Sequence, residues 1–322
     1  MKRIGIPRAL LYYQYYPMWQ VFFEELGAEV VVSSPTTPAM LAEGSSRVVA
    51  DTCLPAKVFL GHVLSLVEQC DFVFIPAIRS TRKNIINCSK FLGLPDMTKS
   101  VIPESPPILE IDIDIGRGNR QLYQAIYQLG MHFTWNPLRI RRAVTAALQA
   151  YGQHRERMIT EKLTLSQAIG ENNREKAPDK SPQATIALIG HPYLLYDDYV
   201  NHRLVHRLEQ AGSRVVTSEM LSPGELESAT TRLVGKAYWT YEEEIVGAGG
   251  HYLQDKVDGI IGVMAFGCGP DSLMVEMVRR QAIRLKSVPF MSLTLEEHTA
   301  EAGIVTRLEA FTDMIQRRKR GQ

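Results

Sequence analysis

An internal repeat constrains the fold of this chain more than any other feature of its sequence. Segment 6–33 aligns without gaps on segment 191–218. Each copy reads as an apolar run, a proline, an amphipathic stretch, a glycine and a β-branched run, which is typical of a strand, a turn, a helix, a helix stop and a second strand. The two helix stops are Gly27 and Gly212. The sequence therefore predicts two copies of one strand–helix–strand unit.

More apolar runs of strand length follow helical patterns in both halves, at 71–76 and 258–263. Such runs are typical of buried parallel strands. We therefore predict an α/β fold with two lobes, each built on an open, doubly wound and mostly parallel sheet. In sheets of this kind the functional loops gather beyond the carboxyl ends of the strands.

The middle of the chain has a different pattern. Residues 118–169 carry apolar residues at helical spacing and predict two or three helices, whereas 171–183 is polar with two prolines and predicts an exposed linker. The predicted organisation is a first α/β lobe over 1–117, a helical segment and linker over 118–183, and a second α/β lobe over 184–322.

Composition places the chain among globular proteins, with 45% hydrophobic and 22% charged residues and a net charge of +1. This charge argues against a nucleic-acid or membrane partner. We see no signal peptide and no apolar run of bilayer length, and we therefore expect a cytoplasmic protein. Disulfides are disfavoured there, so the four cysteines are expected to be reduced, catalytic or metal-bound.

Two cysteines lie in the same local sequence pattern. Cys53 and Cys268 are each followed two residues later by a proline and then by an apolar run of helical spacing. Proline is favoured at the first position of a helix, where the helix dipole also favours a thiolate. Cys88 lies in a loop after a predicted strand, whereas Cys70 ends an apolar helical run and is predicted to be a core residue. We expect Cys53, Cys88 and Cys268 to share one metal centre in a cleft between the lobes.

Two kinds of metal centre fit these residues. Zinc would need a fourth protein ligand, for which His62 or His298 is a candidate, but structural zinc sites usually contain a C-x₂₋₄-C pair and this chain has none. An iron–sulfur cluster held by these three thiolates would leave one iron without a cysteine. Gly267 and Gly269 flank Cys268 and would let the backbone approach a bulky inorganic group. Spacing alone leaves both metals open.

At these residues the chain resembles the 2-hydroxyacyl-CoA dehydratase family and its activase-associated relatives, which include the double-cubane cluster proteins. Five blocks in the same order carry the resemblance, and they run through both lobes. The matching stretches are 4–10, 51–57 with 61–62, 88–96, 266–272, and 294–303 with 306–311.

The resemblance implies two Rossmann-like lobes with a 4Fe-4S cluster between them, held by Cys53, Cys88 and Cys268, with one iron left without a cysteine. It further implies a partner, an ATP-hydrolysing activase or reductase with its own cluster, which delivers low-potential electrons. The chain would then reduce or dehydrate a small substrate, such as an acyl-CoA, at the open iron. Family analogy favours an anaerobic homodimer.

Several residues are candidates for supporting roles. The helix starts after Cys53 and Cys268 would stabilise extra negative charge, to which Lys57 would add. In the loop after the predicted strand 288–293, His298 or Glu297 would deliver a proton to substrate or fill the fourth iron position. The alternative for this loop is structural, with Thr299 capping the helix that follows.

Other residues remain open between function and packing. His62 is predicted to be a packed helix residue, and His191 is ambiguous. Arg79 and Arg82 either attract a CoA or phosphate group or are simply solvated. The aromatic run 12–19 either packs in the core, lines a substrate pocket or forms a partner surface.

Three function classes follow. The first is a cluster-dependent reductase or dehydratase-like enzyme, and the second is a non-catalytic electron carrier or scaffold for a partner enzyme. The third is a two-lobe protein that binds a small ligand, with zinc or no metal. The chain has no G-x-x-x-x-G-K-[ST] loop, so it does not resemble the ATPase itself. Segment 118–183 matches no motif of the family, which leaves the acyl-CoA site unassigned.

Overall fold

A computed structural model describes the chain from residue 1 to 320 except for 83–84, 171–181, 256 and 287. The chain forms two compact units. The first comprises Met1–Glu156 with Tyr238–Thr240, and the second comprises Arg157–Ala237 with Tyr241–Gln322. Most of the predicted linker 171–183 lies outside the described residues.

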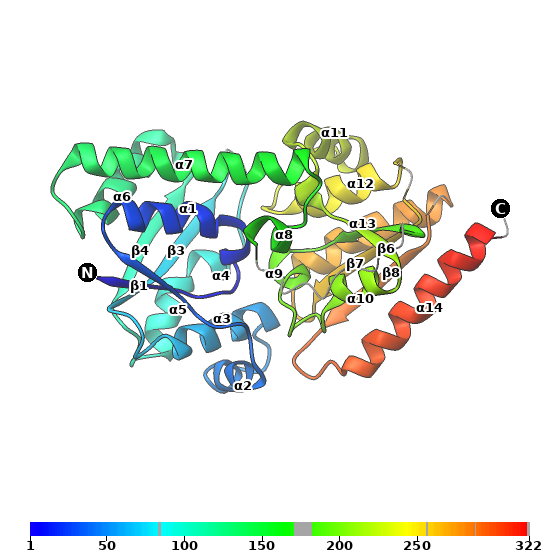
Figure 1. Cartoon of the computed structure of the whole chain (residues 1–322), viewed down its shortest axis with the longest axis horizontal. Helices are drawn as coiled ribbons and strands as arrows, with labels where there is room; N and C mark the ends of the chain where they lie inside the picture. Colours follow the sequence, from blue (N-terminus) through cyan, green and yellow to red (C-terminus); the bar gives the residue numbers. More distant parts are fainter. Residues whose placement is uncertain (83–84, 171–181, 256, 287, 321–322) are drawn as a thin grey trace. The chain divides into compact units, whose positions relative to one another are not determined.

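Each unit is built on a four-stranded parallel sheet (Figure 1), which confirms the predicted α/β fold. The first sheet has the order β2-β1-β3-β4 and the second has the order β6-β5-β7-β8. The first four strands are β1 (Arg3–Ile6), β2 (Glu29–Val32), β3 (Phe72–Ser80) and β4 (Ile108–Asp114). The second four are β5 (Ala184–Ile189), β6 (Ser213–Val216), β7 (Gly259–Ala265) and β8 (Phe290–Leu295).

Helices cover both faces of the first sheet (Figure 1). One layer contains α1 (Tyr12–Glu25), α6 (Asn119–Met131) and α7 (Pro137–Thr160). The other contains α2 (Pro38–Ser46), α3 (Leu54–Ser65), α4 (Ser89–Leu92) and α5 (Leu94–Val101). A 3-10 turn, η1 (Ile115–Arg117), follows β4.

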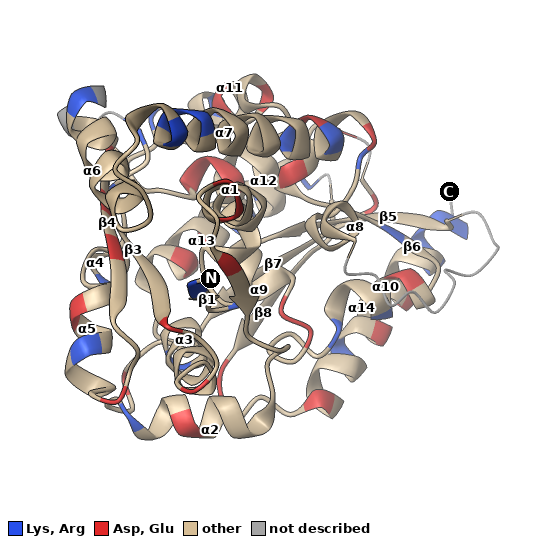
Figure 2. Ribbon diagram, turned by 60° about the vertical axis from the view of Figure 1, so that its left-hand side comes forward, with Lys and Arg blue, Asp and Glu red and all other residues tan. Residues whose placement is uncertain are grey.

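The second unit has the same layered plan. Its helices are α8 (Leu165–Ile169), α9 (Pro192–Leu195), α10 (Leu204–Gln210), α11 (Pro223–Val234), α12 (Ala248–Tyr252), α13 (Gly269–Leu285) and α14 (Glu301–Arg320). A 3-10 turn η2 (Ser218–Met220) follows β6, and a π-helical turn η3 (Glu243–Gly247) precedes α12. The basic last turn of α14 and the basic residues along α7 are blue in Figure 2.

The core of each unit is the apolar strand surface between its helix layers. In the first unit Ile4, Ile75 and Phe23 are fully buried, and in the second Ile186 and Ile260 are fully buried. Burial on both faces explains why these strands read as continuous apolar runs rather than as alternating patterns.

The sheet register corrects one detail of the repeat. Val31 pairs with Gly5, whereas its counterpart Val216 pairs with Ala187, so the first strands of the two copies are three residues out of step with the gapless alignment. The stretch that connects the paired strands β5 and β6 is therefore three residues longer than the stretch that connects β1 and β2.

The central segment 118–169 folds into three helices, α6, α7 and α8, as its periodicity predicted. The helices α6 and α7 (up to Glu156) belong to the first compact unit by their contacts. Among the described residues, no helix combines the length and apolarity needed to cross a membrane.

Candidate functional site

Three of the four cysteines occupy the same structural position, the residue directly before a helix. Cys53 precedes α3 and Cys268 precedes α13, which confirms the two helix starts that were predicted from the proline two residues after each cysteine. Cys88 precedes the four-residue helix α4, which the sequence did not predict. All three are half-buried, and none of them is in a disulfide.

Topology places all three cysteines at the carboxyl edge of a sheet. In a parallel sheet each connecting helix runs back against the strands, so it begins at that edge. Cys53 and Cys88 begin helices that flank β3 of the first sheet, and Cys268 follows β7 of the second. Within each unit the cysteines therefore lie where ligands of α/β proteins usually bind.

Hydrogen bonds hold the loop that carries Cys88. The Asn87 side chain accepts from the Cys88 N–H at 2.9 Å and donates to the Ile78 carbonyl at 3.2 Å. Ile86 pairs with the segment Tyr238–Thr240, donating to the Tyr238 carbonyl at 3.0 Å and accepting from Thr240 N–H at 2.9 Å. The predicted Cys88 loop is thus held by contacts with residues far away in the sequence.

The loop around Cys268 is shaped by two glycines. Gly267 has a φ of +78°, a conformation that favours glycine. A side chain added at Gly269 would meet no atom within 4 Å, so there is open space beside Cys268. The Cys268 N–H donates to the Ala265 carbonyl at 3.1 Å, which closes the turn.

A buried pair of titratable residues supports the same loop. The Oδ2 atom of Asp271 accepts from the Ala265 N–H at 3.1 Å, while its Oδ1 atom lies against Nδ1 of His191. Both side chains are buried. The His191 ring stacks on Tyr193 at 4.8 Å and meets Tyr241 edge-on at 4.7 Å. His191, which the sequence left ambiguous, is therefore a buried partner of the helix that begins after Cys268.

His62 lies inside the first unit, fully buried on α3. Its Nδ1 atom is 2.8 Å from the Ser33 hydroxyl and its Nε2 atom is 2.9 Å from the Thr36 hydroxyl. Burial, followed by the nearby Arg8 guanidinium, lowers the pKa of His62 to about 4. Because both ring nitrogens are hydrogen-bonded, this geometry leaves no nitrogen of His62 for a metal and agrees with the predicted packing role.

These features can now be compared with known families. The family model described as the CoA enzyme activase uncharacterised domain (DUF2229) matches residues 3–221. The chain belongs to this family. A search of curated proteins finds no match.

The match of the activase-domain family covers one unit and the beginning of the next. It includes Cys53, Cys88 and His62, and it ends before Cys268 and His298. The cysteines before α3 and α4 therefore lie within the matched region, whereas Cys268, before α13, lies outside it.

The remaining candidates have clear structural positions in this activase-domain protein. Lys57 is buried on α3, and its ammonium donates to the Ala50 carbonyl at 2.9 Å, in the segment that leads to Cys53. Glu297 and His298 lie in the loop after β8, at the carboxyl edge of the second sheet, with 3.6 Å between Oε1 of Glu297 and Nε2 of His298. The His298 side chain is 84% exposed. The Thr299 hydroxyl accepts from the Glu296 N–H at 2.8 Å and closes this loop.

Two other predictions concern Cys70 and Arg79. Cys70 is buried, as predicted, and its thiol donates to the Leu66 carbonyl at 3.3 Å. Burial raises the pKa of this thiol. Arg79 lies on β3, which extends to Ser80, and its side chain pairs with Asp112 at 3.0 Å.

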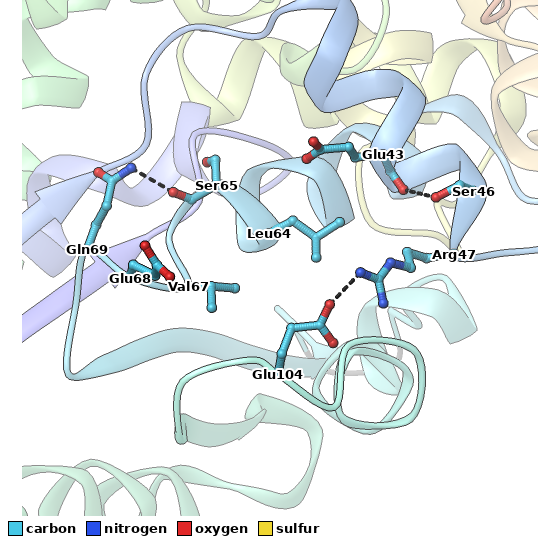
Figure 3. A pocket seen from close by; sticks show the side chains of 9 residues that line it. All are labelled: Glu43, Ser46, Arg47, Leu64, Ser65, Val67, Glu68, Gln69 and Glu104. Carbon is cyan, nitrogen blue, oxygen red and sulfur yellow. Dashed lines mark hydrogen bonds and ion pairs between the residues drawn. The ribbon is translucent and has the colours of Figure 1, made fainter.

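The first unit contains a polar cavity of about 530 Å³ (Figure 3). It lies at the last turn of α3, so it is at the opposite end of that helix from Cys53. Arg47 points to Glu104 and forms an ion pair with it. The lining residues are Glu43, Ser46, Arg47, Leu64, Ser65, Val67, Glu68, Gln69 and Glu104.

Inside either unit, no three described His, Cys, Asp or Glu side chains are grouped closely enough to hold a metal ion. The predicted metal centre draws Cys53 and Cys88 from the first unit and Cys268 from the second. It therefore stays a prediction.

Proposed function

We propose that this chain is a cytoplasmic redox protein in which Cys53, Cys88 and Cys268 hold a 4Fe-4S cluster. In this proposal an ATP-hydrolysing activase with its own cluster supplies low-potential electrons. The chain uses them to reduce or dehydrate a small substrate, for which an acyl-CoA is the candidate class, and it acts as a homodimer. Membership of a CoA enzyme activase-associated family supports the partner.

One observation carries the proposal: three cysteines share the position before a helix, and the fourth is buried in the core. Half-buried thiols at helix starts are more easily ionised than core thiols, and thiolates are the ligands of iron–sulfur clusters. No atom lies within 4 Å of the position that a Cβ on Gly269 would occupy, so nothing crowds this residue next to Cys268. The donor set therefore suits a cluster.

When bound, the cluster would supply one-electron chemistry at low potential. The residues of the chain have separate tasks. The first turns of α3 and α13, which begin directly after Cys53 and Cys268, would stabilise the negative charge of a bound cluster through their N–H groups and positive dipole ends. Lys57 holds the Cys53 segment through the Ala50 carbonyl and adds a positive charge near it. Glu297 and His298 are exposed enough to exchange a proton with solvent and pass it to substrate.

The experiment is anaerobic purification followed by iron and sulfide analysis of the wild type and four single variants. We expect about four irons and four sulfides per wild-type chain. Cys53→Ala, Cys88→Ala and Cys268→Ala should each lose most of this iron. Cys70→Ala is the matched control, because Cys70 is buried in the core, and it should keep its iron.

A colourless wild-type protein with one zinc per chain would contradict the proposal and favour the zinc-containing ligand-binding protein. Loss of iron in Cys70→Ala with retention in Cys88→Ala would contradict the ligand assignment. If the cluster is present, the electron paramagnetic resonance spectrum of the reduced protein separates catalyst from carrier. An added acyl-CoA substrate should perturb the signal of a catalyst and leave that of a carrier unchanged.

A further inference from the structure

The first unit contains a second cavity, of about 300 Å³, between the α1, α6 and α7 layer and the sheet. It lies on the sheet face opposite α3 and α4, which begin after Cys53 and Cys88. Its lining residues are Tyr15, Met18, Trp19, Phe22, Ile78, Thr81, Ile111, Ile113, Ile115, Leu122, Ile126, Val144, Ala147, Leu148 and Tyr151. None of them carries a charge at neutral pH.

The cavity has a deep floor and an accessible rim. Trp19, Phe22, Ile78 and Ile111 form part of the lining and are buried, and the Trp19 ring packs on the core at 4.6 Å from the ring of Phe74. At the rim, Leu148 is 56% exposed. A small molecule can therefore enter the cavity from solvent and contact the buried side chains at its bottom.

The lining is poorly suited to water. Protein interiors are close-packed, and an apolar hollow of this size deprives its wall atoms of contacts. Ordered water needs several polar partners, whereas the polar side-chain groups of this lining are limited to the hydroxyls of Thr81, Tyr15 and Tyr151 and the indole N–H of Trp19. An apolar ligand would restore the missing contacts, and a charged one would lose its hydration without an ion-pair partner.

Size and shape narrow the ligand further. An apolar cavity of about 150 Å³ can hold benzene, so about twice that volume accommodates two fused rings. Aromatic faces border the space, with the rings of Tyr15 and Tyr151 5.7 Å apart and tilted by 31°. The cavity also lies beside the carboxyl ends of β3 and β4, contributed by Ile78 and Ile113, where open α/β sheets commonly bind ligands.

We infer that this cavity is a binding site for a neutral aromatic molecule of one or two rings. The ring system packs between Trp19 and the isoleucines of β3 and β4. The Thr81 hydroxyl, which is 3.5 Å from that of Thr240, is available for a single polar contact near the strand end. This site goes beyond the proposed redox function, and it requires neither the cluster nor the second unit.

Isothermal titration calorimetry of the metal-free full chain with indole tests this inference independently of cluster loading. We expect saturable binding of one indole per chain. Indole-3-carboxylate, which adds a negative charge, should bind at least about tenfold more weakly. Val144→Phe fills the cavity from α7 and should weaken indole binding at least about tenfold. Thr145→Phe is the matched control, because it adds the same ring at an exposed neighbouring position, and its affinity should stay within about twofold.

Circular dichroism checks that the variants fold, and Ile126→Phe fills the same cavity from α6 if Val144→Phe is unstable. Absence of saturable indole binding to the wild type would overturn the inference. Equal affinity in the cavity-filling variants and the control would do the same, because indole would then bind elsewhere. A third outcome is that the wild type does not bind indole and that Val144→Phe changes the sedimentation coefficient of the chain. The cavity would then be a contact with a second copy, and the ligand site would be ruled out.

Discussion

The two units have the same sheet order but differ in the helix that follows their first strand. In the first unit α1 is one continuous helix of 14 residues. In the second unit the same stretch is divided into α9, with four residues, and α10, with seven. The two units thus have the same strand order but a different helical connection after the carboxyl end of the first strand.

Side-chain hydrogen bonds explain the division of the second helix. The Asp197 carboxylate accepts from two backbone N–H groups just after α9. Asn201 donates to the carbonyls of Leu194 and Leu195 at 3.0 and 2.8 Å and accepts from Leu204 N–H at 3.0 Å. Asp and Asn side chains compete in this way with the regular helical ladder. They satisfy the backbone groups that the break exposes.

The units also differ in what their buried polar residues contact. In the first unit Ser33 accepts from the Arg8 N–H and bonds to His62. Its counterpart Ser218 is buried, and its hydroxyl has no hydrogen-bond partner among the described residues. The second unit instead has the His191–Asp271 pair beside the α13 start. The repeat conserves the sheet, whereas the buried polar contacts are specific to each unit.

The largest predicted effect tests the buried histidine of the first unit. The pKa of His62 is about 4 in the folded chain, against 6.5 for an ordinary histidine. Between these values the unfolded chain binds a proton that the folded chain does not, so stability falls as pH falls. The contribution of His62 is fully present above pH 6.5, and about 3 kcal/mol of it is lost by pH 4.

His62→Gln removes the titrating group and keeps an amide that can donate and accept hydrogen bonds. We expect the unfolding free energy of the wild type to drop by about 3 kcal/mol more than that of the variant between pH 7 and pH 4. Tryptophan fluorescence is the measurement, because Trp19, Trp135 and Trp239 all belong to the first unit. Parallel pH curves for the two proteins would show that His62 is not buried as a neutral ring.

The next effect compares the two serines directly. Ser33→Ala leaves the Arg8 N–H and Nδ1 of His62 without this hydroxyl, and we expect a loss of about 2 kcal/mol. Ser218→Ala removes a buried hydroxyl that has no partner, so its effect should lie within about 0.5 kcal/mol or be stabilising.

Denaturant unfolding followed by tryptophan fluorescence measures the first variant, and hydrogen exchange of the β6 amides measures the second. Similar losses for the two variants would mean that Ser218 has a partner equivalent to His62. The proposed difference between the units would then be wrong at this position.

The sequence predicted those features that depend on near neighbours. Gly27 and Gly212 gave the helix stops, and the prolines after Cys53 and Cys268 gave two helix starts, because proline and glycine act through their own backbone angles. Continuous apolar runs gave the parallel sheets. The helix start after Cys88 was missed because no proline stands in its first turn.

The buried polar contacts could not be predicted from local patterns. His62 meets Ser33 across 29 residues of sequence, and Asp271 meets His191 only after β5, β7 and α13 have assembled. The apolar cavity likewise requires α1, α6, α7 and two strands together, although the aromatic run 12–19 indicated a pocket as one of its alternatives.

The smallest effect concerns the feature that the two units share most closely, the glycine that ends the first helix. Gly27 has a φ of +83° and Gly212 a φ of +79°. An alanine at Gly27 would place its Cβ 2.8 Å from Nη2 of Arg139, a flexible side chain that can move, whereas an alanine at Gly212 would have its nearest contact at 3.9 Å. Both substitutions should therefore cost about 1 kcal/mol, mainly from the backbone conformation.

Gly303→Ala is the control for these two variants, because Gly303 lies within α14, has open space around its Cβ position and does not have a positive φ. It should be neutral or stabilise the chain by up to about 1 kcal/mol, since alanine favours a helix over glycine. Thermal unfolding followed by circular dichroism compares the three variants. Equal losses for Gly27→Ala and Gly212→Ala mean that the helix stop is the same device in both units. A loss of stability in only one of the two variants would mean that the helix stop depends on contacts within that unit rather than on the shared backbone conformation. The structural repeat would then be limited to the sheets.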